Sequence, residues 1–119
     1  MTISTKELLS QHCVPHQTAL GDAAIAAALP SVPGWALEDG KLSRLFKFHN
    51  YYETLAFVNA LAYVAHAQDH HPELTVNYNS CTVRYATDSV DQGRGGLSEN
   101  DFICAAKVTA LHQGSVAAA

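Results

Sequence analysis

The chain has 119 residues, of which 48% are hydrophobic, and its 7 Lys and Arg against 11 Asp and Glu give a formal net charge of −4. This length predicts one domain with a single core over residues 1–119, and an acidic balance without any basic run argues against nucleic acid as the main partner. No apolar stretch approaches the ~18 residues of a membrane span and the first ten residues lack the basic start of a secretory signal, so we expect neither.

The N-terminal part of the chain, residues 1–33, is predicted to form an arm and a first helix ahead of a core over residues 34–113. Ser4 and Glu7 have the spacing of a helix capping box. The alanine-rich residues 22–29 favour a helix by their intrinsic propensity.

Two strands are predicted next, over residues 35–37 and 42–48. Asp39-Gly40 lies between them, and this dipeptide is a strong signal for a tight hairpin turn.

A long helix follows, with Asn50 as its N-cap and Glu53 three residues later. It should end before Pro72, because a residue that precedes proline avoids the helical region. Apolar residues at three- and four-residue steps predict its buried stripe: Leu55, Val58, Ala62 and Ala65.

A second strand pair is predicted over residues 74–78 and 81–87, followed by a flexible, glycine-rich loop over residues 89–96. Ser98 then caps a last helix, whose expected sheet-facing side carries Phe102, Ala106 and Ala110. The order α-β-β-α-β-β-α predicts an α+β fold, a four-stranded antiparallel sheet with helices packed on one face. The other face or an edge strand would be available for self-association.

The stretch His70-His71-Pro72-Glu73 marks the predicted change from helix to strand. Two imidazoles at a fixed chain reversal are suited to acid and base chemistry near neutral pH, since the ordinary histidine pKa is ~6.5. A solvated junction that carries histidines would give the same sequence. Adjacent helical residues point ~100° apart, so the two rings could serve different sides of one ligand.

Asp101 lies three residues after the predicted cap Ser98. A carboxylate in the first turn of a helix is favoured by capping and by the helix dipole. The same side chain can also belong to a functional site.

A metal site and a disulfide framework are both disfavoured. His66 and His70 have the i, i+4 spacing of two ligands of one ion, but a third ligand would have to come from the distant Asp88. We therefore expect no metal. The three cysteines are odd in number and lack a Cys-x-x-Cys spacing, which fits a reducing cytoplasm; Cys81 and Cys104 fall at apolar positions and are predicted to be core residues.

Several of these segments together resemble the pterin-4a-carbinolamine dehydratase family, with the motifs in family order over residues 29–110. The matching residues are Gly34-Trp35, Arg44-x-Phe46-x-Phe48, Phe57-Val58, His70-His71-Pro72-Glu73, Asn77-Tyr78-Asn79 and Gly96-Leu97-Ser98-x-x-Asp101. The resemblance implies the same α+β architecture, assembled as a homodimer or a tetramer, and no organic cofactor or metal.

The family's reaction is the loss of water from a 4a-hydroxytetrahydropterin, which needs an acid for the departing hydroxyl and a base for the N5 proton. By position, His70 and His71 match the histidine pair that contacts the pterin and transfers protons. Asp101 matches the aspartate that completes the site. The resemblance further implies substrate contacts around the following residues: Pro72, Glu73, Thr87 and Asp88.

Three positions depart from the family pattern. Asp88 follows Thr87 where the family has a third histidine, His66 replaces a usual glutamate, and Leu74 replaces a usual tryptophan. The loop after Asp88 is also longer than is common. Losing one acid/base group can lower a rate by ~10²–10⁴-fold while the fold is retained.

These departures, the N-terminal arm and the segments 51–57 and 100–107 resemble the dehydratase-like branch associated with α-carboxysomes. The members of that branch lack a complete catalytic set and act as Rubisco assembly factors. The resemblance implies a catalytically impaired assembly factor, with the Rubisco large subunit as partner and a cytoplasmic, carboxysome-associated location. The alternative is an active pterin dehydratase that uses His70, His71 and Asp101.

Overall fold

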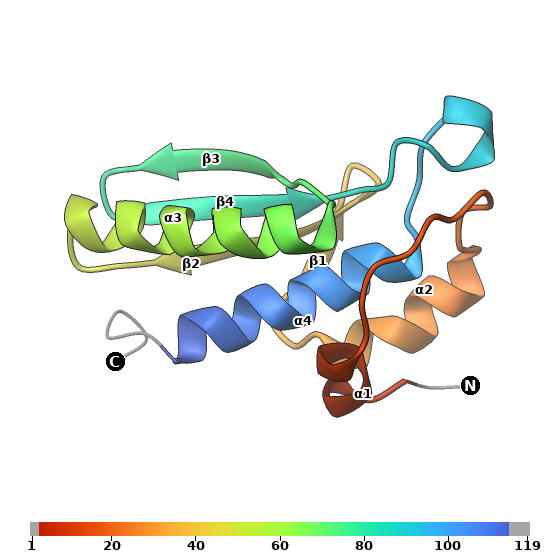
Figure 1. The fold of residues 1–119 in the computed structure, drawn as a ribbon, viewed down its shortest axis with the longest axis horizontal. Coiled ribbons are helices and arrows are strands. Elements are labelled where there is room, and N and C mark those ends of the chain that lie inside the picture. The colour runs from red at the N-terminus through yellow and green to blue at the C-terminus, as the bar shows by residue number, and fades with distance from the viewer. Residues whose placement is uncertain (1–2, 115–119) are drawn as a thin grey trace.

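A computed structural model describes residues 3–114 of the protein (Figure 1). Its centre is a four-stranded antiparallel sheet in the order β1-β2-β4-β3. The strands are β1 (Ala36–Glu38), β2 (Lys41–Lys47), β3 (Glu73–Asn77) and β4 (Ser80–Tyr85). Helices α3 (Tyr51–Gln68) and α4 (Glu99–Gln113) pack on one face of this sheet, which confirms the predicted α+β architecture (Figure 1).

The hairpin between β1 and β2 forms where Asp39-Gly40 predicts it. Both residues have positive φ, 51° and 76°, as a type I′ turn, a common two-residue hairpin turn, requires. Alternate β2 side chains then face the helices, and Phe46 packs between Phe57 of α3 and His112 of α4. These ring contacts bring both helices onto the same face of the sheet.

Helix α3 begins as predicted, with the Asn50 side chain accepting the Glu53 N–H at 2.9 Å. The predicted buried stripe is wrong at two positions, because Leu55 and Ala62 are exposed. The helix is apolar on most sides, so apolar spacing alone fits several rotations. Its side toward the sheet consists of Thr54, Phe57, Leu61 and Ala65.

The N-terminal region contains two helices where one was predicted. They are α1 (Thr5–Ser10), with the expected Ser4–Glu7 capping box, and α2 (Asp22–Ala28), which continues into the 3-10 turn η1 (Leu29–Ser31). The alanine-rich segment forms α2 alone, because residues 11–21, which form neither helix nor strand, separate it from α1.

Helix α4 is buried on several sides, since it lies between the sheet and the N-terminal helices (Figure 1). Residues 11–21 run along its N-terminal end, where Leu20 N donates to Leu97 O at 2.8 Å. The loop after β4 carries the short turn η2 (Asp91–Gly93) and is tied to the same segment, with Asp91 N donating to Gln17 O at 2.8 Å. None of the helices in residues 3–114 has the length and apolar character to cross a membrane.

Candidate active site

The His70 corner is shaped by the way α3 ends. Asp69 adopts the left-handed conformation (φ 49°), and the chain closes a Schellman motif in which Asp69 N donates to His66 O and His70 N donates to Ala65 O, at 3.2 and 3.1 Å. This reversal carries the His70 side chain inward and leaves His71 exposed. The helix ends before Pro72, as predicted.

His70 forms a short, shielded pair with Asp101. The His70 Nε2 to Asp101 Oδ1 distance is 2.6 Å, with 11% of the histidine side chain and 0% of the aspartate side chain exposed. The imidazole also stacks on the buried ring of Tyr85, with 5.5 Å between centroids and 15° between planes. The ring is therefore held in one orientation by a carboxylate and an aromatic face.

Asp101 is itself held from two sides. Its Oδ2 accepts the Thr87 hydroxyl at 2.8 Å and the Ser98 backbone N–H at 2.9 Å, the second being the acidic half of a capping box at the start of α4. The Thr87 and Ser98 hydroxyls are 2.7 Å apart. Asp101 thus caps its helix and orients His70 with the same carboxylate.

The pKa of His70 is raised above its ordinary value of 6.5. Burial alone would lower this pKa, but the hydrogen bond and the negative charge of Asp101 outweigh it, with smaller contributions from Cys13 and Asp88. His70 therefore retains its proton at a higher pH than a free histidine does.

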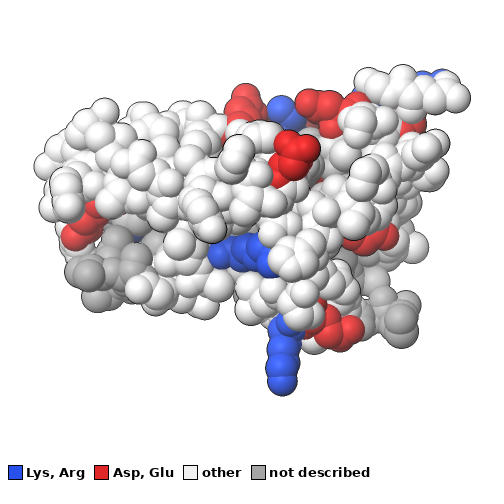
Figure 2. All heavy atoms as spheres, in the orientation of Figure 1, with Lys and Arg blue, Asp and Glu red and all other residues white. Residues whose placement is uncertain are grey.

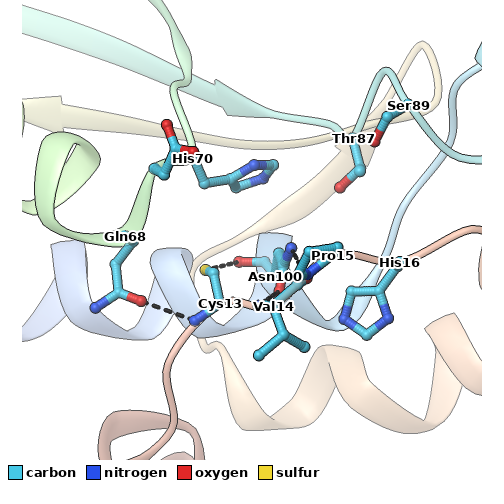
Figure 3. A pocket seen from close by; sticks show the side chains of 10 residues that line it. Cys13, Val14, Pro15, His16, Gln68, His70, Thr87, Ser89 and Asn100 are labelled. Atoms are coloured by element: carbon cyan, nitrogen blue, oxygen red, sulfur yellow. Dashed lines mark hydrogen bonds between the residues drawn. The ribbon is translucent and has the colours of Figure 1, made fainter.

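A pocket of about 220 Å³ opens beside this pair (Figure 3). His70 and Thr87 contribute to its wall from the core of the fold, and the N-terminal segment supplies the opposite wall. The full lining is Cys13, Val14, Pro15, His16, Gln68, Asp69, His70, Thr87, Ser89 and Asn100.

The other predicted site residues lie near His70. Pro72 is half-buried, His71 is exposed, and Glu73 is exposed at the start of β3, 3.1 Å from Lys41 Nζ. Asp88 is exposed directly after Thr87, near enough for its charge to raise the pKa of His70. The structure thus brings His70, Thr87 and Asp101 into direct contact and places the remaining four on nearby surface.

The pocket wall from the N-terminal segment is the part that sequence reasoning missed. Asn100 holds it: the Asn100 side chain accepts the Val14 N–H at 3.1 Å and donates to Val14 O at 2.7 Å. On the other side, Cys13 N donates to Gln68 Oε1 at 2.8 Å. Asn100 beside Asp101 at the start of a helix is only a weak indication of a functional site. Both residue types are common at helix starts in proteins that have no functional site there.

The described residues offer no cluster of side chains suited to bind a metal ion. Residues 3–114 contain no group of three or more His, Cys, Asp and Glu placed to hold an ion. His66 is exposed on α3, and the His70 ring is turned onto Asp101.

Comparison with protein families matches residues 18–111 to the family described as "Pterin 4 alpha carbinolamine dehydratase". Two relatives bear the name "Putative pterin-4-alpha-carbinolamine dehydratase". The protein from Bdellovibrio bacteriovorus is 50% identical over 109 residues, which cover 92% of this chain and 91% of that protein. A protein from Stenotrophomonas maltophilia is 54% identical over 109 residues, with 87% and 90% covered.

A solved structure has the same arrangement of elements. It is a crystal structure from Brucella melitensis described as a "transcriptional coactivator/pterin dehydratase", with a TM-score of 0.71 and 32% identity. The match covers 79% of this chain and 98% of the other. The family match, these relatives and the solved structure together show that the chain belongs to the pterin 4 alpha carbinolamine dehydratase family.

Proposed function

We propose that the chain binds a 4a-hydroxytetrahydropterin at the His70 pocket and removes water from it at a reduced rate. The observation that carries this proposal is the shielded His70–Asp101 pair, with 2.6 Å between the two side chains and with His70 on the wall of the pocket. The names of the relatives support this substrate class.

The reaction breaks the bond between C4a and the hydroxyl oxygen, and the oxygen leaves as water after taking up a proton. His70 suits the acid role, because its raised pKa favours the protonated imidazole more than in a free histidine. Asp101 holds Nε2, so Nδ1 is the ring atom that can exchange a proton with a ligand. His71, exposed at the same corner, is assigned as the acceptor of the N5 proton.

Asp88 is the reason for expecting a reduced rate. The family has a histidine at this position, and an imidazole can both donate and accept a proton near neutral pH. A carboxyl group has an ordinary pKa of ~4, so near neutral pH it is ionised and has no proton to donate.

The test is a spectrophotometric assay of carbinolamine dehydration by purified wild-type protein and its variants. We expect a wild-type rate above that in buffer, a loss of ~10² or more in His70→Ala and His71→Ala, and a gain in Asp88→His. His66→Ala, an exposed change on the same helix, is the matched control and should keep the wild-type rate. A wild-type rate equal to that in buffer contradicts the proposal.

Rubisco assembly is the second candidate function, favoured by Asp88 and by the surface over α3. Figure 2 shows that this face carries few charged side chains. Tyr52 and Tyr63 are 81% and 75% exposed on this helix, and exposed aromatic groups are enriched where proteins associate. We propose that the Rubisco large subunit binds there.

Co-expression with Rubisco subunits tests this second function by the yield of assembled enzyme. The yield should rise with the wild-type protein and fall back with Tyr52→Glu and Tyr63→Glu. Lys47→Glu, an exposed change on β2, is the control and should retain the effect. If wild-type protein gives the same yield as an empty vector, the assembly role is wrong.

A further inference from the structure

Cys13 and Cys104 meet beside the pocket although 91 residues separate them in the chain. Their sulfur atoms are 3.5 Å apart, and both cysteines are free. Cys104 belongs to α4 and is fully buried, whereas Cys13 is half-buried and lines the pocket, below the His70 ring in Figure 3.

The contact is fixed by the backbone around Cys13. Its N–H donates to Gln68 Oε1 at 2.8 Å, and the next residue, Val14, exchanges two hydrogen bonds with Asn100. Asn100 lies one helical turn before Cys104 on α4. The segment is therefore held on both sides of its cysteine, with the two sulfurs facing each other.

The two thiols differ in reactivity. The pKa of Cys13 is lowered, first by the hydrogen bond with the Cys104 thiol and then by the positive charge of His70, against the effect of burial. The pKa of Cys104 is raised by the same hydrogen bond and by burial. Since the thiolate is the nucleophile, Cys13 is the residue that reacts first.

We propose that Cys13 and Cys104 are a peroxide-sensitive dithiol that closes to an intramolecular disulfide. No motif in the sequence indicates this modification site. It is independent of the proposed reaction, because its chemistry requires the thiols alone.

Hydrogen peroxide is the oxidant, and the electrons balance in two steps. The Cys13 thiolate attacks one peroxide oxygen, an S–O bond forms, the O–O bond breaks, and the released hydroxide takes up the thiol proton to leave as water. The Cys104 sulfur then attacks the Cys13 sulfenic acid, an S–S bond forms, and the hydroxyl leaves with the Cys104 proton as a second water. Two thiols are oxidised by two electrons and one peroxide is reduced.

Closing the disulfide would bring the sulfur atoms from 3.5 Å to about 2.05 Å and tie residue 13 covalently to α4. The pocket wall opposite His70 would then be fixed. A cross-link that closes so long a loop also restricts the unfolded chain, so the oxidised protein should unfold at a higher temperature.

The test treats the full chain with hydrogen peroxide and then counts free thiols, maps the peptides and measures Tm. We expect the three thiols to fall to one, a Cys13–Cys104 linked peptide within one chain, and a Tm that rises by about 5 °C or more. The Cys13→Ser variant should keep both of its remaining thiols after peroxide treatment. The matched control, Cys81→Ser, should still form the bond, because Cys81 lies on β4 and takes no part in the pair.

Three results would overturn the proposal: three thiols that survive peroxide, a disulfide between two chains or with Cys81, or Cys13 oxidised to sulfinic acid while Cys104 stays free. A variant at the buried Cys104 can fail to fold. Cys13→Ser, at a half-buried position, therefore carries the test.

Discussion

At the scale of single residues, Asp101 combines two roles in one side chain. Its Oδ2 caps α4 through the Ser98 N–H, and its Oδ1 binds His70 Nε2. The sequence indicated both roles, but it could not show that they are compatible. They are compatible because a carboxylate has two oxygens, and each role uses a different one.

Replacing Asp101 should therefore change both stability and the proton on His70. We expect Asp101→Asn to lower the free energy of unfolding by about 1–3 kcal/mol, because a hydrogen bond to a buried charged group is lost. The pKa of His70 should fall, since Asp101 makes the largest of the contributions that raise it. Urea denaturation and NMR titration of the histidines measure the two effects. An unchanged His70 pKa would contradict this account of the pair.

The His70 pair also predicts a pH dependence of stability. The pKa of His70 is raised above 6.5 in the folded protein, so the folded state binds the proton more tightly than the unfolded chain does. This stabilisation is complete below pH 6.5 and is lost as the pH rises through the folded-state pKa. The difference in unfolding free energy between wild type and His70→Gln should therefore shrink as the pH rises from about 6.5.

Denaturation curves at several pH values measure that difference. His66→Gln, which replaces an exposed histidine on the same helix, is the matched comparison. A difference for His70→Gln that grows with pH would show that the folded protein prefers the neutral ring.

At the scale of elements, the end of α3 decides where the two histidines point. The sequence predicted that the helix ends before Pro72, yet proline alone leaves the direction of the chain open. Asp69 sets the direction of the chain after α3, because it adopts the left-handed conformation at the C-terminal cap. Nothing in the local sequence marks Asp69 for this role, since glycine is the usual residue there.

The left-handed position makes opposite predictions for two substitutions. Asp69→Gly should raise the free energy of unfolding by about 0.5–1 kcal/mol, because glycine lacks the Cβ that disfavours positive φ. Asp69→Val should lower it by about 1 kcal/mol or more, because a β-branched residue is strained there. Chemical denaturation distinguishes the signs, and two changes in the same direction would contradict the assigned conformation.

At the scale of the whole molecule, the N-terminal segment belongs to the core and to the pocket. Sequence patterns predicted the sheet, its hairpins and the helix caps, because these depend on neighbours within a few residues. They missed the docking of residues 11–21 on α4, since contacts between residues 13 and 104 or 14 and 100 leave no local pattern. The buried side of α3 was missed for a related reason, because several sides of that helix are apolar.

Two adjacent leucines test whether α1 is part of the core. Leu8 is 1% exposed and Leu9 is 40% exposed. Leu8→Ala should lower the free energy of unfolding by about 2–4 kcal/mol, as for a buried leucine elsewhere, whereas Leu9→Ala should change it by less than about 0.5 kcal/mol. Equal effects, measured by urea denaturation, would show that α1 is a detachable arm.

The seating of residues 13–16 against α4 has a consequence for the order of synthesis. Residues 13–16 leave the ribosome long before Asn100 and Cys104, the α4 residues that contact this segment. Until α4 emerges, Cys13 lacks its partner thiol and Val14 lacks the Asn100 side chain. The pocket is therefore completed only after α4 has been synthesised, although its N-terminal wall is made much earlier.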